Sequence, residues 1–151
     1  MKVGEAGSCP MVSHRGISVR LVLPDAVPAN ARIEGALEIT NDGNEEVEVV
    51  SPHSNAAMNI VVFDRHWNAV PADSLGKANV APQRSALAPG QTASFELIDL
   101  AFTTGTSRSS YRLRPGIYYA LAIYHPGTAR LPDQSFYPVA VPSNVAKLEV
   151  V

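Results

Sequence analysis

Alternation of apolar and polar residues with a period of two recurs along this chain, and helical periodicity does not. Such alternation predicts β-strands that bury one face, because successive side chains of a strand point to opposite sides. Seven segments carry this alternation or a dense run of β-branched and aromatic residues, and turn-forming residues separate most of them. The expected strands span residues 17–23, 31–40, 45–50, 58–64, 91–100, 117–125 and 144–151.

Seven short strands without helices predict an all-β fold, an antiparallel immunoglobulin-like β-sandwich with Greek-key connections. A closed β-barrel is the alternative. The chain has 151 residues, of which 46% are hydrophobic and 17% charged, so it suits one folded domain. We expect residues 17–151 to form this domain and residues 1–16 to be a flexible N-terminal segment. The longer connections at 71–90, 101–114 and 126–143 hold most of the irregular sequence.

The clearest turn follows the second expected strand, in which Ile33, Leu37 and Ile39 share one side. Residues 41–44 read "NDGN". Because Asn, Asp and Gly tolerate positive φ, this sequence is typical of a hairpin turn. We therefore expect segments 31–40 and 45–50 to pair as a hairpin.

Cysteine usage and hydropathy bear on where the chain works. Cys9 is the only cysteine, so no disulfide forms within the chain. Residues 1–16 lack the apolar run of a signal peptide, and no window approaches the roughly 18 continuous apolar residues of a membrane helix. A cytoplasmic protein without a membrane partner is the expectation.

Charge is spread unevenly around a net value of −2. Residues 1–50 hold four basic and eight acidic side chains, a balance of −4, whereas residues 101–151 hold five and two, a balance of +3. The basic loop 106–114 contains Arg108, Tyr111 and Arg112. Nucleic-acid binding needs a broader positive face, so no nucleic acid is expected. An acidic protein surface is the favoured contact for these three residues, with arginine binding carboxylates through two N–H groups.

The only tryptophan, Trp67, lies at the end of an expected strand, within "FDRHWN". Lone tryptophans of such domains usually pack over the sandwich core, and we favour that placement. In the alternative, His66 and Trp67 lie on a loop and contact a protein partner, since Trp is enriched at interface hot spots.

The sequence contains few residues at the spacings typical of metal sites or catalytic sites. None of the histidines lies at a spacing that puts two metal ligands on one element. His53, His66 and His125 could meet Asp64 in the folded chain, but isolated polar residues are the favoured outcome, so neither a metal nor a cofactor is expected. The sequence contains no G-x-S-x-G elbow and no P-loop, and we expect no enzymatic activity.

A Pro-Gly turn precedes the most apolar strand, "GIYYALAIY" at 116–124. Immunoglobulin-like sandwiches often contain a corner tyrosine that bonds back to upstream backbone. The turn spacing of Pro115 and Gly116 favours Tyr118 for this role, and Tyr119 is the alternative. If Tyr118 faces the core, a bulky row of Tyr119, Leu121 and Ile123 faces outward. We expect one of the long connections to cover that row; if it is exposed, it marks an interface.

Four segments together resemble a known family. They are "LEITNDGNEEVEV", "NIVVFDRHWNAV", "LAPGQTASFEL" and "LRPGIYYALAIY". Their succession, over roughly residues 31–125, resembles the intracellular proteinase inhibitor family of bacilli. The resemblance implies an immunoglobulin-like sandwich and a non-catalytic binding module. No inhibitory loop matches residue by residue, so the inhibitory activity itself is not carried over.

The sequence therefore predicts a non-catalytic module that recognises a protein partner through loops at the sandwich ends, and the resemblance implies that it is inhibitor-like. One alternative is a self-assembling structural β-sandwich that forms homo-oligomers. The other is a sandwich that binds copper or zinc.

Overall fold

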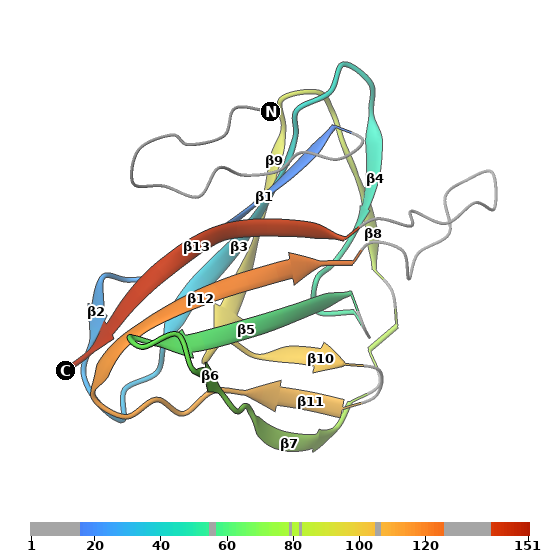
Figure 1. Cartoon of the computed structure of the whole chain (residues 1–151). Helices are drawn as coiled ribbons and strands as arrows, with labels where there is room; N and C mark the ends of the chain where they lie inside the picture. Colours follow the sequence, from blue (N-terminus) through green and yellow to red (C-terminus); the bar gives the residue numbers. More distant parts are fainter. Residues whose placement is uncertain (1–15, 55–56, 79, 82, 105–106, 126–139) are drawn as a thin grey trace.

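A computed structural model describes residues 16–54, 57–78, 80–81, 83–104, 107–125 and 140–151 (Figure 1). Seven strands of the model correspond to those expected from the sequence. They are β1 (Ile17–Val22), β3 (Glu34–Asn41), β4 (Val47–Val50), β5 (Met58–Asp64), β9 (Thr92–Ile98), β12 (Gly116–Tyr124) and β13 (Val141–Val150). Apart from Gly16, the N-terminal segment 1–16 lies outside the described residues, as does most of the connection 126–143.

Six shorter strands were not predicted. They are β2 (Ala26–Val27), β6 (Ala69–Val70), β7 (Asp73–Lys77), β8 (Arg84–Leu87), β10 (Phe102–Thr104) and β11 (Ser107–Ser110). Four of them lie in connections that were expected to be irregular. These strands are short, and β7 is exposed at every position, so no buried face leaves an alternating pattern in the sequence.

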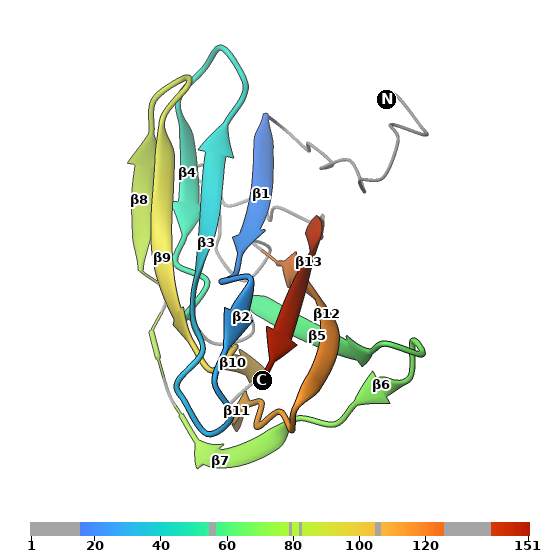
Figure 2. The ribbon, with the colours of Figure 1, turned by 90° about the vertical axis from the view of Figure 1, so that its left-hand side faces the viewer.

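The described strands form open sheets rather than a closed barrel, and the fold is an immunoglobulin-like β-sandwich. One large sheet has the order β1–β3–β9, and the other has the order β2–β13–β12–β5–β6 (Figures 1 and 2). The chain crosses from the first sheet to the second between β3 and β5, returns at β9 and crosses again to β12, a Greek-key route. Strands β10, β11 and β7 form a third sheet. In the part of the chain that the model describes, no helix is long and apolar enough to cross a membrane.

The expected hairpin between segments 31–40 and 45–50 is wrong. Strand β3 pairs with β1 and β9, whereas β4 pairs with β8. The reason lies in the buried side chain of Asn41, whose Nδ2 donates to the carbonyl oxygens of Glu45 at 2.8 Å and Leu87 at 2.9 Å. Its Oδ1 accepts the N–H of Gly43 at 2.9 Å. The turn thus directs the chain away from β3 and towards β8.

The core lies between the inner faces of the two large sheets. Its fully buried aliphatic residues include Val19, Leu21, Leu37 and Ile39 from one sheet and Ile60, Val62, Ala120 and Ala122 from the other. Side-chain amides and hydroxyls form hydrogen bonds between strands that do not pair with each other in a sheet. Asn144 on β13 accepts the N–H of Leu21 at 2.8 Å and donates to its carbonyl oxygen at 3.1 Å, which joins β13 of one sheet to β1 of the other.

A buried tyrosine of β12 ties this strand to β4. The Tyr124 hydroxyl donates to the carbonyl oxygen of Val50 and accepts the N–H of the same residue at 2.9 Å. A buried hydroxyl must find such partners, because an unsatisfied one costs about 1–3 kcal/mol. The Tyr124 hydroxyl therefore bonds to both the N–H and the carbonyl oxygen of Val50, whose strand β4 pairs only with β8 among the described strands.

Candidate binding surface

The outer face of the β5–β12–β13 part of the larger sheet is apolar and aromatic. Pairing register places two rows of side chains across these strands. The rows are Val61–Leu121–Val145 and Phe63–Tyr119–Lys147. Because Ile60, Val62 and Ala120 point into the core, their neighbours in sequence must point outward. We call Val61, Phe63, Trp67, Tyr119, Leu121, Ile123 and Val145 the aromatic face.

Trp67 lies on this face and not in the core, so its predicted packing against the core is wrong. Its ring stacks on that of Tyr119, with centroids 4.6 Å apart and planes 14° apart. Phe63 approaches the same indole at 5.9 Å. The Trp67 side chain nevertheless remains 59% exposed. Strand β5 ends at Asp64, beyond the last inward position at Val62, and the turn that follows carries Trp67 back over the outer side of the sheet.

The turn that holds Trp67 is fixed by hydrogen bonds at Asp64. Its Oδ1 accepts the N–H groups of His66 at 2.8 Å and Asn68 at 3.0 Å. Its backbone also pairs with Trp67 and Asn68. The N–H of Asn68, together with that of His66, holds the pKa of the Asp64 carboxyl below its usual value. The carboxylate form is therefore the one that stabilises this turn.

Trp67 adopts a left-handed backbone conformation, with φ at +64°. This region suits glycine or asparagine and costs a bulky residue on the order of 1–3 kcal/mol. Backbone preference therefore does not explain a tryptophan at this position. The conformation instead lays a large aromatic ring flat on the sheet with one side open to solvent.

The other predicted contact residues are scattered. His66 is exposed in the same turn as Trp67. Arg108 is exposed on β11, which belongs to the third sheet, and Arg112 is exposed in the segment before β12. The structure thus brings together only His66 and Trp67 of the predicted set.

The side chain of Tyr111 is buried and does not project from the surface as predicted. It is 5% exposed, its hydroxyl donates to the carbonyl oxygen of Ile60 at 2.7 Å, and its ring stacks on Phe102. Burial raises the pKa of Tyr111. The loop 106–114, from which it was expected to project, contains strand β11, and Tyr111 follows this strand with its side chain turned inward.

The corner tyrosine is resolved by a single hydrogen bond. Tyr118 donates from its hydroxyl to the carbonyl oxygen of Arg114 at 2.8 Å, across the Pro115–Gly116 turn. Tyr119, the alternative, stacks under Trp67 on the outer face.

The bulky row beside these tyrosines is only partly covered. Tyr119, Leu121 and Ile123 are half-buried, and Val145 is 37% exposed. The long connection that was expected to cover them lies, over residues 126–139, outside the described residues.

Histidine and acidic side chains do not assemble into a metal centre in the described ranges. No group of three His, Cys, Asp or Glu side chains there is placed to hold an ion. His53 instead packs edge-on against Phe95, with ring centroids 6.5 Å apart.

No protein-family model matches this sequence, and neither does any curated protein. Among solved structures, the chain is similar to the CARDB domain of the PF1109 protein from Pyrococcus furiosus, in complex with di-metal ions. The match has 13% identity and a TM-score of 0.43, and covers 89% of this chain and 87% of that domain. The yjhA protein from Bacillus subtilis is similar at 9% identity and a TM-score of 0.36, over 94% and 96% of the two chains.

The β-glucosidase of Listeria innocua in complex with isofagomine is similar at 16% identity and a TM-score of 0.40. The match covers 89% of this chain but only 16% of the enzyme. These likenesses concern the fold alone. The resemblance to the proteinase inhibitor family stays a prediction.

Proposed function

We propose that this chain is a non-catalytic protein-binding domain and that the aromatic face is its contact surface. One observation carries the proposal: Trp67 is fixed by stacking on Tyr119 in a left-handed turn, yet 59% of it is exposed. The contact surface differs from the loop ends expected from the sequence, because the aromatic residues lie on a sheet face.

The geometry of Trp67 suits an interface anchor. Trp and Tyr dominate interface hot spots because they bury a large area and lose few rotamers on binding. Here the indole is already ordered by Tyr119, Phe63 and the Asp64 turn, so binding would order it little further. The adjoining row of Val61, Leu121 and Val145 extends the apolar area across three strands.

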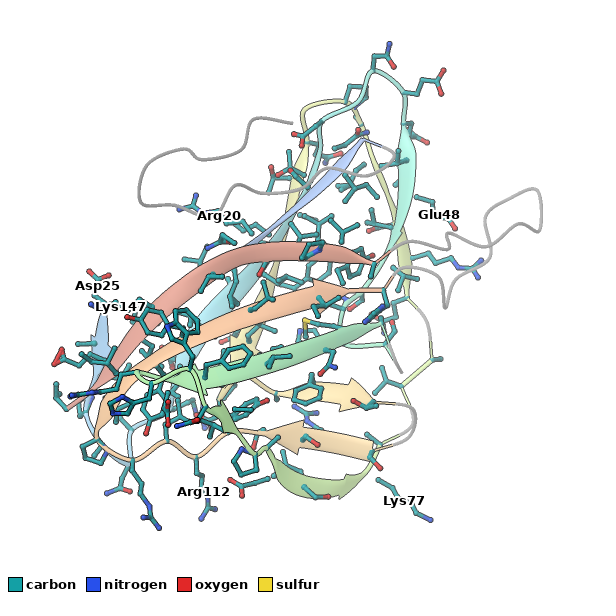
Figure 3. All side chains as sticks on the ribbon, viewed as in Figure 1. Arg20, Asp25, Glu48, Lys77, Arg112 and Lys147 are labelled. Carbon is teal, nitrogen blue, oxygen red and sulfur yellow. The ribbon has the colours of Figure 1, made fainter. Side chains whose placement is uncertain are left out.

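Charges at the border of the face define the partner's chemistry. Arg65 and His66 are exposed in the Trp67 turn, and Lys147 is exposed opposite Tyr119 on β13 (Figure 3). The carboxylate of Asp64 is engaged by two N–H groups of its own turn. A complementary partner would present an apolar centre bordered by carboxylates. The resemblance to the inhibitor family makes a protease one protein to include among those assayed.

The test begins with affinity capture from the native host and continues with the captured protein in purified form. We expect Trp67→Ala to weaken its binding at least tenfold, because a hot-spot tryptophan contributes on that scale. Thr92→Ala, on the outer face of the other large sheet, is the matched control and should bind as the wild type does. Equal binding by wild type and Trp67→Ala would overturn the proposal.

Self-association is the second candidate, since the Val61–Leu121–Val145 row could pack against the same row of another copy. Light scattering on the eluted protein distinguishes the two. A dimer that Leu121→Glu converts to a monomer would support self-association, whereas a wild-type monomer would contradict it.

A further inference from the structure

A cleft at one end of the sandwich, separate from the aromatic face, has the construction of a ligand site. It lies between the segment that follows β2 and the segment that precedes β12, and its volume is about 350 Å³. Its apolar and aromatic lining consists of Val27, Pro28, Ala31, Ile33, Tyr111, Leu113 and Val150. Of these, Val27, Ile33 and Val150 are buried and form a small hydrophobic cluster of their own. Small-ligand sites are typically concave and combine apolar side chains with polar groups at fixed positions. Here Asn30, Arg32, Asp99 and Arg112 supply the polar groups.

Asp99 holds the walls of the cleft together. Its N–H donates to the carbonyl oxygen of Ile33 at 2.8 Å, and its Oδ1 accepts the N–H of Ile33 at 2.9 Å. Its carbonyl oxygen accepts the N–H of Tyr111 at 3.0 Å. Three segments far apart in sequence are thus fixed by one residue, so the cleft is preformed.

Left-handed backbone conformations gather at the same place. Four non-glycine residues of the described chain have positive φ, and three of them are Asn30, Asp99 and Leu100, at +63°, +52° and +54°. Asn30 and Asp99 line the cleft, and Leu100 follows directly. Asparagine and aspartate tolerate this region, so only Leu100 carries backbone strain here.

Two guanidinium groups, of Arg32 and Arg112, also line the cleft. Figure 3 shows Arg112 at the lower end of the molecule. Within the described ranges, Arg20 and Arg84 are paired with Glu38 and Glu48, whereas neither Arg32 nor Arg112 forms an ion pair. An arginine without a carboxylate partner remains available for one, and its planar donor set binds carboxylates through two hydrogen bonds.

We propose that this cleft binds a carboxylate carried on a branched apolar group. The apolar group would pack against the half-buried Leu113 and the outer side of the Val27–Ile33–Val150 cluster, and Arg32 and Arg112 would bind the carboxylate. The C-terminal residue of a peptide and a free short-chain acid share this chemistry, and the experiment separates these two sources.

The test is an NMR titration of the full chain with acetyl-alanyl-leucine as the free acid, and with the same peptide as its C-terminal amide. We expect the acid to shift the backbone amides of Ile33, Arg112 and Leu113. We expect the amide to bind at least tenfold more weakly, because it lacks the charge that the arginines recognise. 4-Methylpentanoate is titrated in parallel. If 4-methylpentanoate binds as tightly as the peptide acid, the ligand is a free short-chain acid. If it binds much more weakly, the ligand is the C-terminus of a peptide.

Variants complete the test. Arg32→Gln and Arg112→Gln should each weaken the acid's binding about tenfold, on the scale of one charge-assisted hydrogen bond. Arg84→Gln, on β8, is the matched control and should leave it unchanged. Both target arginines are exposed, and retained amide-shift dispersion verifies folding. Equal binding of acid and amide, or no shift with either, overturns the proposal, and neither result bears on the aromatic face.

Discussion

Both large sheets turn aliphatic side chains inward, but their outer faces differ in chemistry. On the β1–β3–β9 sheet the outward rows are polar: Ser18–Thr40–Thr92 and Arg20–Glu38–Ser94. The hydroxyls of Thr40 and Thr92 lie 2.8 Å apart, within hydrogen-bond distance, and the side chain of Arg20 lies 4.0 Å from that of Glu38. On the aromatic face, the equivalent positions hold aliphatic and aromatic residues over most of three strands.

The difference shows what folding alone requires. A sandwich is satisfied when each sheet buries one face, and the outer face of an antiparallel sheet is normally solvated and polar. The β1–β3–β9 sheet follows this rule at Arg20, Thr92 and Ser94, which are exposed, whereas Ser18 is buried. The aromatic face does not follow the rule. Under the proposed function a protein partner would cover it and recover about 25 cal/mol for each Å² of apolar surface buried.

The largest expected effect separates the inner from the outer residues. Leu37→Ala should lower the free energy of unfolding by about 2–5 kcal/mol, since Leu37 is 0% exposed between the sheets. Leu121→Ala, at a half-buried outer position, should cost roughly half of that or less. Urea unfolding of the two variants checks the difference. Equal losses would mean that the aromatic face is packed as tightly as the core, contrary to its assignment as a free surface.

A pair of variants at Trp67 isolates the backbone contribution to the aromatic face. Trp67→Gly and Trp67→Ala lose the same ring stacking, but glycine adopts positive φ without strain. We therefore expect Trp67→Gly to be more stable than Trp67→Ala by about 1 kcal/mol.

The same pair at Arg65, which lies in this turn without positive φ, is the control. There the glycine variant should be the less stable one in thermal unfolding. The same order at both positions would contradict a strained conformation at Trp67.

Tyr118 and Tyr119 are neighbours in β12, but Tyr118 fixes the corner before the strand and Tyr119 belongs to the aromatic face. Tyr118→Phe removes the hydrogen bond to Arg114 and should cost about 0.5–1.5 kcal/mol. Tyr119→Phe should change stability by only a few tenths of a kcal/mol, because its contribution is the ring that supports Trp67. Chemical denaturation measures both. A larger loss of stability for Tyr119→Phe than for Tyr118→Phe would show that Tyr118 is not the corner tyrosine.

The sequence predicted the long strands because each combines a buried face with turn residues at its ends. It missed β7 and β11, whose exposed, serine-containing segments are held by pairing to distant residues. It also predicted a hairpin that the amide of Asn41 prevents by binding Leu87, 46 positions away. Contacts of this range leave no local pattern.

The candidate surface was only partly predictable. The outward direction of Tyr119, Leu121 and Ile123 followed from the corner at Tyr118. The sequence predicted that this row is covered, and the structure shows the three side chains half-buried. Trp67 was placed wrongly because periodicity ends where β5 ends, and the turn at Asp64 decides which way the indole lies. Tyr111 was misplaced for a related reason, since its inward direction depends on the unpredicted β10–β11 pair.

The smallest expected effect concerns the pH dependence of the Trp67 turn. The pKa of Asp64 is lowered from an ordinary value of 3.8, so its carboxylate stabilises the folded turn. That stabilisation is complete above the ordinary value and is lost as the pH falls through the lower folded value. We expect the emission of the only tryptophan to shift with a midpoint below pH 3.8, while far-UV circular dichroism shows the sheets intact. In Asp64→Asn the amide oxygen can still accept the two N–H groups but does not titrate, so the shift should disappear. The same shift in that variant, or a midpoint above pH 3.8, would show that Asp64 does not control the orientation of Trp67.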